Sequence, residues 1–175
     1  ELKSMALPKS LFEETNALFM ELKNTFILDI CAKFRKDQIN ENLFLKGIYP
    51  QIDTIEKAKE ERFGALEHIA STIEALFEET NRSTISIEWL ESEGHYILMS
   101  KNRFALIEEK LMQSFITIGE KHYFFKDFTY RHLKNSVKIS ASLIEEISQE
   151  IVLNNLHMIA LVKQRYDEML EKIET

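Results

Sequence analysis

Glycine, proline and cysteine are scarce in this chain. Its 175 residues include four glycines, two prolines and one cysteine. Because glycine and proline interrupt regular structure, their scarcity favours long elements, above all helices. The single cysteine, Cys31, excludes an intramolecular disulfide and a multi-cysteine metal site, and it fits a reducing, cytoplasmic location.

Several functional features are also missing. No apolar run approaches the roughly 18 to 20 residues that cross a bilayer, so no membrane contact is expected. There is no glycine-rich phosphate loop, and the histidines lack the spacing of a helical metal motif. We therefore expect no catalytic residue, no cofactor site and no metal site in this chain. The net charge of −7 has the wrong sign for a protein that binds nucleic acid over its whole surface.

Apolar residues recur at helical spacing in three stretches. They predict helices at about 9–36, 51–81 and 131–175, with an extended connector at 37–50. The second and third helices are long enough to pack antiparallel as a stalk. The chain begins at Glu1 and ends on a helical pattern, which suggests a piece of a longer protein.

Between the second and third helices the pattern changes to that of a β structure. The predicted strands are 84–90, 95–100, 115–118 and 121–128. A turn at Glu91–Gly94 joins the first two, a short helix at 102–113 follows, and Gly119 turns the last two into a second hairpin. We therefore expect a mainly α fold: a long antiparallel helical stalk with a small four-stranded antiparallel β tip inserted between the two long helices.

The predicted domains follow this division, with a helical part at 1–81 and 131–175 and a β-rich tip at 82–130. Three motifs occur in order along them. Residues 46–53 (KGIYPQID) resemble K-x-G-Y-D-x-x-L-D, and residues 94–101 (GHYILMSK) resemble G-Y-Y-I-E-V-T-K. Residues 121–125 (KHYFF), followed by Tyr130, resemble K-Q-T-L-V-N-A-E-R-Y, just ahead of the third helix.

These three patterns belong to the lever and clamp regions of MutS-family DNA mismatch recognition proteins, and the resemblance covers about residues 25–170. It implies that the helices form a lever and that the tip is a clamp. The clamp would contact the backbone of duplex DNA, mismatched or branched, without reading its sequence. The expected contacts with phosphates are Lys101, Arg103, Lys121 and Lys126. The resemblance further implies a non-catalytic fragment of a dimeric parent, whose missing domain would bind ATP and Mg²⁺ and hydrolyse ATP.

The tip departs from the family beside its first glycine. Leu90 and Glu91 replace an Asn-Lys pair that faces DNA in the family, and Glu93 adds a second carboxylate, which repels phosphates. Between Arg82 and Arg131 there are seven basic and seven acidic residues, so the tip is neutral rather than basic. The alternative function is therefore a protein-interaction or scaffold module of a diverged MutS-like paralogue that has lost mismatch binding.

Aromatic residues are frequent in the tip. They are Trp89, Tyr96, Phe115, Tyr123, Phe124, Phe125 and Phe128. Such side chains can stack on the bases of single-stranded nucleic acid, or they can form the core of a small sheet. The sequence favours core packing for most of them, with Tyr123 and Tyr130 as the exposed ones.

Overall fold

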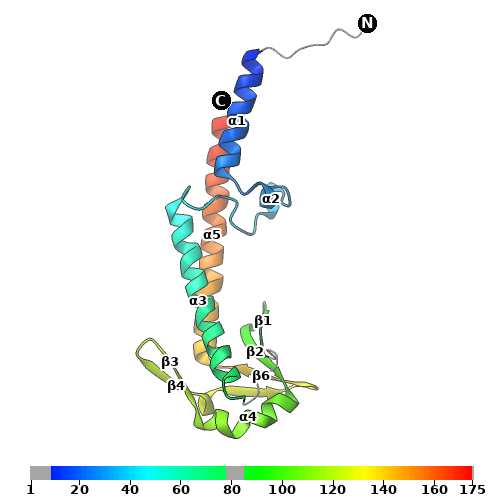
Figure 1. Cartoon of the computed structure of the whole chain (residues 1–175), viewed down its shortest axis with the longest axis vertical. Helices are drawn as coiled ribbons and strands as arrows, with labels where there is room; N and C mark the ends of the chain where they lie inside the picture. Colours follow the sequence, from blue (N-terminus) through cyan, green and yellow to red (C-terminus); the bar gives the residue numbers. More distant parts are fainter. Residues whose placement is uncertain (1–8, 78–84, 175) are drawn as a thin grey trace. The chain divides into compact units, whose positions relative to one another are not determined.

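The computed structural model describes residues 9–77 and 85–174, and Figure 1 shows the order of the elements. The helices are α1 (Lys9–Thr25), α2 (Leu28–Cys31), α3 (Pro50–Glu74), α4 (Lys101–Gln113) and α5 (Ser142–Glu174), with 3₁₀ turns η1 (Lys36–Gln38) and η2 (Phe125–Asp127). The strands are β1 (Ile85–Leu90), β2 (Gly94–Ser100), β3 (Phe115–Ile118), β4 (Lys121–Phe124), β5 (Thr129–His132) and β6 (Ser136–Ser140). The chain divides into two compact units, residues 57–154 and residues 1–56 with 155–175. None of the helices in the described ranges is long and apolar enough to cross a membrane.

The expected mainly α fold with one four-stranded tip is wrong, because the protein is mixed α/β. The residues described contain six strands in two antiparallel sheets. One sheet has four strands in the order β1-β2-β6-β5, and the other consists of β3 and β4 alone. The two predicted hairpins lie near their expected positions, but they do not join each other. Instead β2 pairs with β6, where Ile97 lies opposite Ile139.

The additional strands lie where the third long helix was expected to begin. Leu133 and Val137 have helical spacing, and that spacing predicts a helix from 131 onward. The five residues of β6 also alternate in character, however, and Val137 and Ile139 are fully buried on one face of the sheet. Because a strand is fixed by the burial of one face, the alternation outweighs the helical spacing. Helix α5 consequently begins at Ser142.

The aromatic run at 121–128 is not a single strand. β4 ends at Phe124, and η2 follows it. Phe125 and Phe128 are both buried, and their ring centroids lie 5.0 Å apart. Side chains three residues apart share one side of a 3₁₀ turn but point to opposite sides of a strand. The core therefore receives both rings only because the chain turns at η2.

The core of the unit 57–154 lies between the four-stranded sheet and three helices. The sheet contributes Ile97, Met99, Val137 and Ile139, α4 contributes Phe104, Ile107 and Leu111, α3 contributes Leu66, Ile69 and Ile73, and α5 contributes Leu143, Ile144, Ile147 and Ile151. Because neighbouring residues of a strand point to opposite faces, Tyr96, Leu98 and Lys138 belong to the outer face of the sheet. The division at 82–130 stays a prediction; the compact unit is larger than that segment.

The unit of residues 1–56 with 155–175 is built around aromatic rings. Helix α1 ends at Thr25 rather than near residue 36, because Phe26 leaves the helix and forms a β-bridge with Phe44. The two rings stack with centroids 5.0 Å apart, and the N–H of Ile27 donates to the carbonyl of Leu43 at 2.8 Å. The helical spacing of residues 26, 30 and 34 thus reflects inward-facing side chains of a turn and of the short helix α2.

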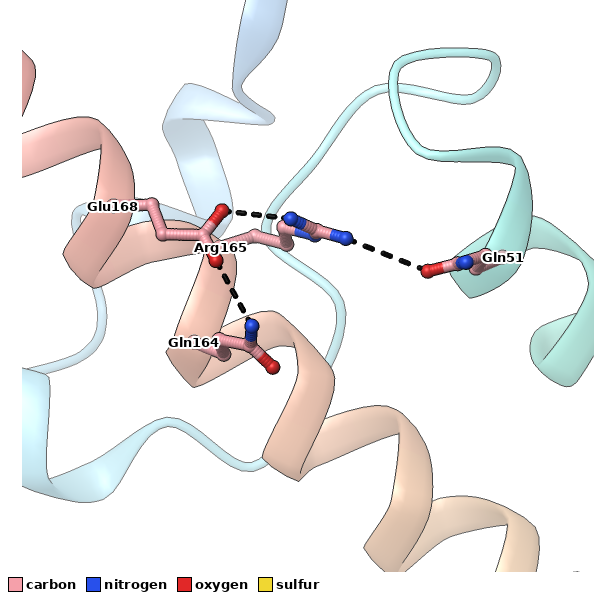
Figure 2. Close-up of polar contacts among 4 residues, drawn as sticks. All are labelled: Gln51, Gln164, Arg165 and Glu168. Atoms are coloured by element: carbon pink, nitrogen blue, oxygen red, sulfur yellow. Dashed lines mark hydrogen bonds and ion pairs between the residues drawn. The ribbon is translucent and has the colours of Figure 1, made fainter.

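Polar contacts fix the start of α3 in this unit. Gly47 has a positive φ of 92°, and its N–H donates to Oδ2 of Asp53 at 2.8 Å. The first family-like motif therefore has a structural role at the entry to α3. Figure 2 shows a second contact, in which Arg165 donates to Glu168 at 2.7 Å and to Gln51 at 3.5 Å. The hydrogen bond from Arg165 lowers the pKa of Glu168.

Candidate nucleic-acid interface

Lys101 and Arg103 lie in the first turn of α4. The Oγ of Ser100 accepts the N–H of Arg103 at 3.4 Å and caps the helix. The N–H of Lys101 donates to the carbonyl of Asn135 at 3.1 Å, so this turn is fixed beside the loop that joins β5 to β6. That loop carries Lys134, whose side chain is exposed. Sequence reasoning misses Lys134 as a candidate, because the helical spacing at 131–141 hides the loop.

Arg103 is half-buried and has a packing role as well as a charge. Its guanidinium carbon lies 5.1 Å from the centroid of the Phe77 ring, which is a cation–π contact. The guanidinium therefore covers the face of the Phe77 ring. Among the four predicted contacts with phosphate, Arg103 is the one whose side chain is most involved in packing within the fold.

Lys121 and Lys126 lie at the β3–β4 hairpin. Lys121 is the first residue of β4, opposite Ile118 and next to the turn at Gly119, and its side chain is exposed. Lys126 is exposed in η2, and its ammonium lies 5.2 Å from the centroid of the Phe124 ring. The N–H of Phe125 donates to the carbonyl of Ser114 at 3.1 Å, which fixes η2 at the C-terminal end of α4.

The four predicted contacts therefore form two groups rather than one. Figure 1 shows α4 running from the end of β2 to the β3–β4 hairpin. Lys101 and Arg103 are at its first turn, whereas Lys121 and Lys126 follow its last turn. A helix of 13 residues is about 20 Å long. The two groups are thus separated by a distance that only an extended ligand can bridge.

Glu93, which argued against DNA binding, takes part in an ion pair within the fold. Its carboxylate accepts a hydrogen bond from the ammonium of Lys138, a residue of β6 that is 8% exposed. The same ammonium lies 3.9 Å from the centroid of the Tyr96 ring. The hydrogen bond and charge of Lys138 lower the pKa of Glu93, and the charge of Arg131 adds to this. Glu93 therefore neutralises a buried cation, a role that the sequence conceals because Lys138 is expected in a helix.

The turn between β1 and β2 is fixed against α5. Gly94 has a positive φ of 72°, and a Cβ atom placed on it would lie 2.7 Å from Oγ of Ser148. That hydroxyl accepts the N–H of His95 at 2.8 Å and lies 2.8 Å from its Nδ1. Burial lowers the pKa of His95. Gly94, the glycine of the second family-like motif, thus permits the β1–β2 turn to approach α5 closely. Glu91 and Glu93 belong to the same turn.

Both the total and the distribution of charge bear on nucleic-acid binding. Residues 85–141 contain eight Lys and Arg against seven Asp and Glu, which is close to neutral. Lys121, Lys126 and Lys134 are exposed and form no ion pair with any residue in 9–77 or 85–174. Glu93, by contrast, is paired. Because this pair removes one base and one acid together, the remaining charge of the segment stays close to neutral, and the exposed Glu120 and Asp127 adjoin Lys121 and Lys126 in the sequence.

Exposure of the aromatic residues differs from expectation. Tyr123 and Tyr130 are half-buried rather than exposed, and the hydroxyl of Tyr130 donates to the carbonyl of Phe125 at 2.7 Å. The rings of Phe115 and Phe124 in the second hairpin and of Trp89 in the first are exposed, so these three do not pack in the core. No group of His, Cys, Asp and Glu among the described residues could hold a metal ion.

No family model matches the sequence, and no curated protein is significantly similar to it. The assignment of a function therefore depends on the residues and contacts described above.

Proposed function

We propose that the unit 57–154 binds the sugar-phosphate backbone of duplex DNA without sequence specificity, as the clamp of a MutS-like protein. Lys101, Lys121 and Lys126 contact the phosphates, with Arg103 partly engaged in packing and Lys134 as an additional contact. DNA carries its negative charge along both strands, so separated cations on one unit suit an extended ligand. Mismatched or branched duplexes are the expected substrates, and ATP binding and dimerisation belong to a longer parent protein.

The observation that carries this proposal is the exposure of Lys121, Lys126 and Lys134, which have no carboxylate partner among the described residues. Of the two carboxylates of the first turn that argued against binding, Glu93 is held by Lys138, whereas Glu120 and Asp127 near the lysines stay exposed. Unpaired surface lysines bind phosphates by releasing counterions, and this contribution to affinity needs no base contact.

Fluorescence anisotropy of a labelled duplex, titrated with the full chain at low salt, tests the proposal. We expect binding that weakens linearly in log Kd against log salt, with the same slope for unrelated sequences. Absence of binding to paired, mismatched and branched duplexes, at a salt concentration where the chain is folded, would sink the proposal.

The second candidate function is a protein-interaction module, and helix α1 supplies the observation in its favour. Leu11, Phe12, Leu18, Phe19 and Met20 are all exposed on this helix. Their concentration on one short helix is unusual for a surface that meets only water. The variant Phe12→Ala/Phe19→Ala separates the candidates: it leaves DNA binding unchanged if the first holds, and it abolishes association with a partner protein if the second does.

A further inference from the structure

The β3–β4 hairpin has one buried face and one exposed face, and the exposed face is aromatic. Ile116 is buried, and Tyr123 lies opposite it on the inner face. On the outer face Phe115 lies opposite Phe124, and Thr117 lies opposite His122. These four residues form what we call the outer aromatic surface. A solvated strand face normally carries polar residues, so two phenylalanines there need an explanation.

The two rings are accessible and held beside each other. Phe115 is 51% exposed and Phe124 is 46% exposed. Their centroids lie 5.9 Å apart, and the ring of His122 lies 5.3 Å from that of Phe115. The Oγ1 of Thr117 lies 2.8 Å from Nδ1 of His122, a hydrogen bond that fixes the imidazole. The aromatic groups thus form a prearranged surface.

A positive charge lies directly at this surface. The ammonium of Lys126 is 5.2 Å from the centroid of Phe124, whereas Lys121, opposite Ile118, belongs to the other face of the hairpin. Two acids are also close in sequence: Glu120 in the hairpin turn and Asp127 beside Lys126. Of these charges, Lys126 is the one in contact with an exposed ring.

We propose that the outer aromatic surface stacks an unpaired base of a single-stranded DNA arm, next to the duplex that the neighbouring lysines hold. Every base has an aromatic face, so such stacking tolerates any sequence, and a cation at the ring matches the phosphate attached to the base. This inference rests on the proposed function, because it extends the backbone contact to junctions between duplex and single strand.

The size of the surface favours a base over a protein partner. Two phenylalanines that are about half exposed offer on the order of 100 Å² each. A stable protein interface buries roughly 800 Å² on each partner, several times more than these two rings provide. One or two bases, by contrast, can be covered by two neighbouring rings.

A forked duplex with 2-aminopurine in its single-stranded arm provides the test, with a fully paired duplex as reference. We expect the full chain to bind the fork about tenfold more tightly than the paired duplex and to change the 2-aminopurine fluorescence. Phe115→Ala and Phe124→Ala should each remove most of that preference without altering affinity for the paired duplex. Phe124→Trp should retain it, whereas Phe124→Leu should not, because leucine keeps the apolar contact and loses the ring.

Phe12→Ala is the matched control, since it removes an exposed phenylalanine from α1 in the other unit and should change neither affinity. Equal affinity for fork and paired duplex would overturn the inference and leave the proposed function standing. Failure to bind either DNA would overturn both. If the chain self-associates and Phe115→Ala or Phe124→Ala makes it monomeric without affecting fork binding, the surface is a protein contact and the inference is wrong.

Discussion

The two hairpins of the unit 57–154 use their residues in opposite ways. In the β1–β2 hairpin, Gly94 and His95 contact Ser148 of α5, and Glu93 is paired with Lys138. In the β3–β4 hairpin, Phe115 and Phe124 face outward, and Lys121 makes no ion pair within the described ranges. A residue whose polar or charged group is paired inside the fold contributes to stability, whereas an exposed group without a partner is available to bind a ligand. Trp89 and Leu90 of β1 are exposed as well, so the contrast is between the turn of the first hairpin, which is held against α5, and the outer face of the second hairpin, to which we assign binding.

Gly94→Ala is expected to have the largest effect on the first hairpin. A non-glycine residue at positive φ costs about 1 kcal/mol or more, and the new Cβ would also collide with Ser148, so we expect a loss of about 2–4 kcal/mol in the free energy of unfolding. Gly119→Ala is the matched control, because Gly119 has a φ of 62° but open space around its Cβ position. It should cost about 1 kcal/mol. Urea denaturation of both variants measures the difference, and equal losses would refute the close approach to Ser148.

Acidification should remove the stability contributed by the first hairpin in two steps. Burial lowers the pKa of His95 below its ordinary value of 6.5, and Lys138 lowers the pKa of Glu93 below its ordinary value of 4.5, so the unfolded chain binds protons more readily than the folded one. Stability contributed by each group is complete above its unfolded pKa and is lost as the pH falls through the lowered folded value. The melting temperature should therefore decline below pH 6.5 and again below pH 4.5.

Single substitutions separate these two steps. His95→Gln should remove the first step, and Glu93→Gln should remove the second. Glu93→Gln should also lower the melting temperature at pH 7, because it leaves the ammonium of Lys138 buried without a counter-charge. An unchanged profile in either variant would assign that step to another group.

For the second hairpin, Lys121→Ala and Lys126→Ala should weaken DNA binding several-fold each. Each loss removes about one phosphate contact, so the slope of log Kd against log salt should fall by about 0.9. Lys57→Ala is the control, since Lys57 is exposed on α3 and already paired with Glu61 at 3.6 Å. Anisotropy titrations at several salt concentrations measure this slope. If the slope of log Kd against log salt stays the same in both variants, these lysines are not part of the interface.

Glu91→Lys should have the smallest effect, less than about twofold on DNA affinity, because the turn that contains Glu91 lies against α5 and a distant charge is screened. If this substitution created binding in a protein that otherwise had none, the native chain would not be a DNA clamp. The scaffold function would then be preferred.

Sequence reasoning located the elements whose local pattern is unambiguous. The alternation before and after Glu91–Gly94 and the amphipathic pattern of α4 both correspond to observed elements. It failed where two periods overlap, as at 131–141. Because β5 and β6 were not predicted, Lys134 was missed as a candidate contact and Lys138 was missed as the partner of Glu93. Pairing between β2 and β6 is long-range, so no local pattern could reveal that Glu93 meets Lys138.

The aromatic residues show a second limit. Phe115, Phe124 and Phe125 look alike in sequence, yet the first two are exposed and the third is fully buried. Alternation along β4 separates Phe124 from Phe125, but the burial of Phe128 together with Phe125 arises at η2, where the chain leaves the strand. A strand assignment for 121–128 cannot predict that turn.

Hydrogen exchange of the backbone amides, measured with and without duplex DNA, tests the contrast between the hairpins most directly. The full chain is used, and exchange is followed peptide by peptide. We predict that DNA slows exchange in residues 101–103 and 119–127 and leaves residues 88–95 unchanged. Slower exchange confined to residues 88–95, or no change in either hairpin while DNA is bound, would contradict the assignment of binding to the second hairpin.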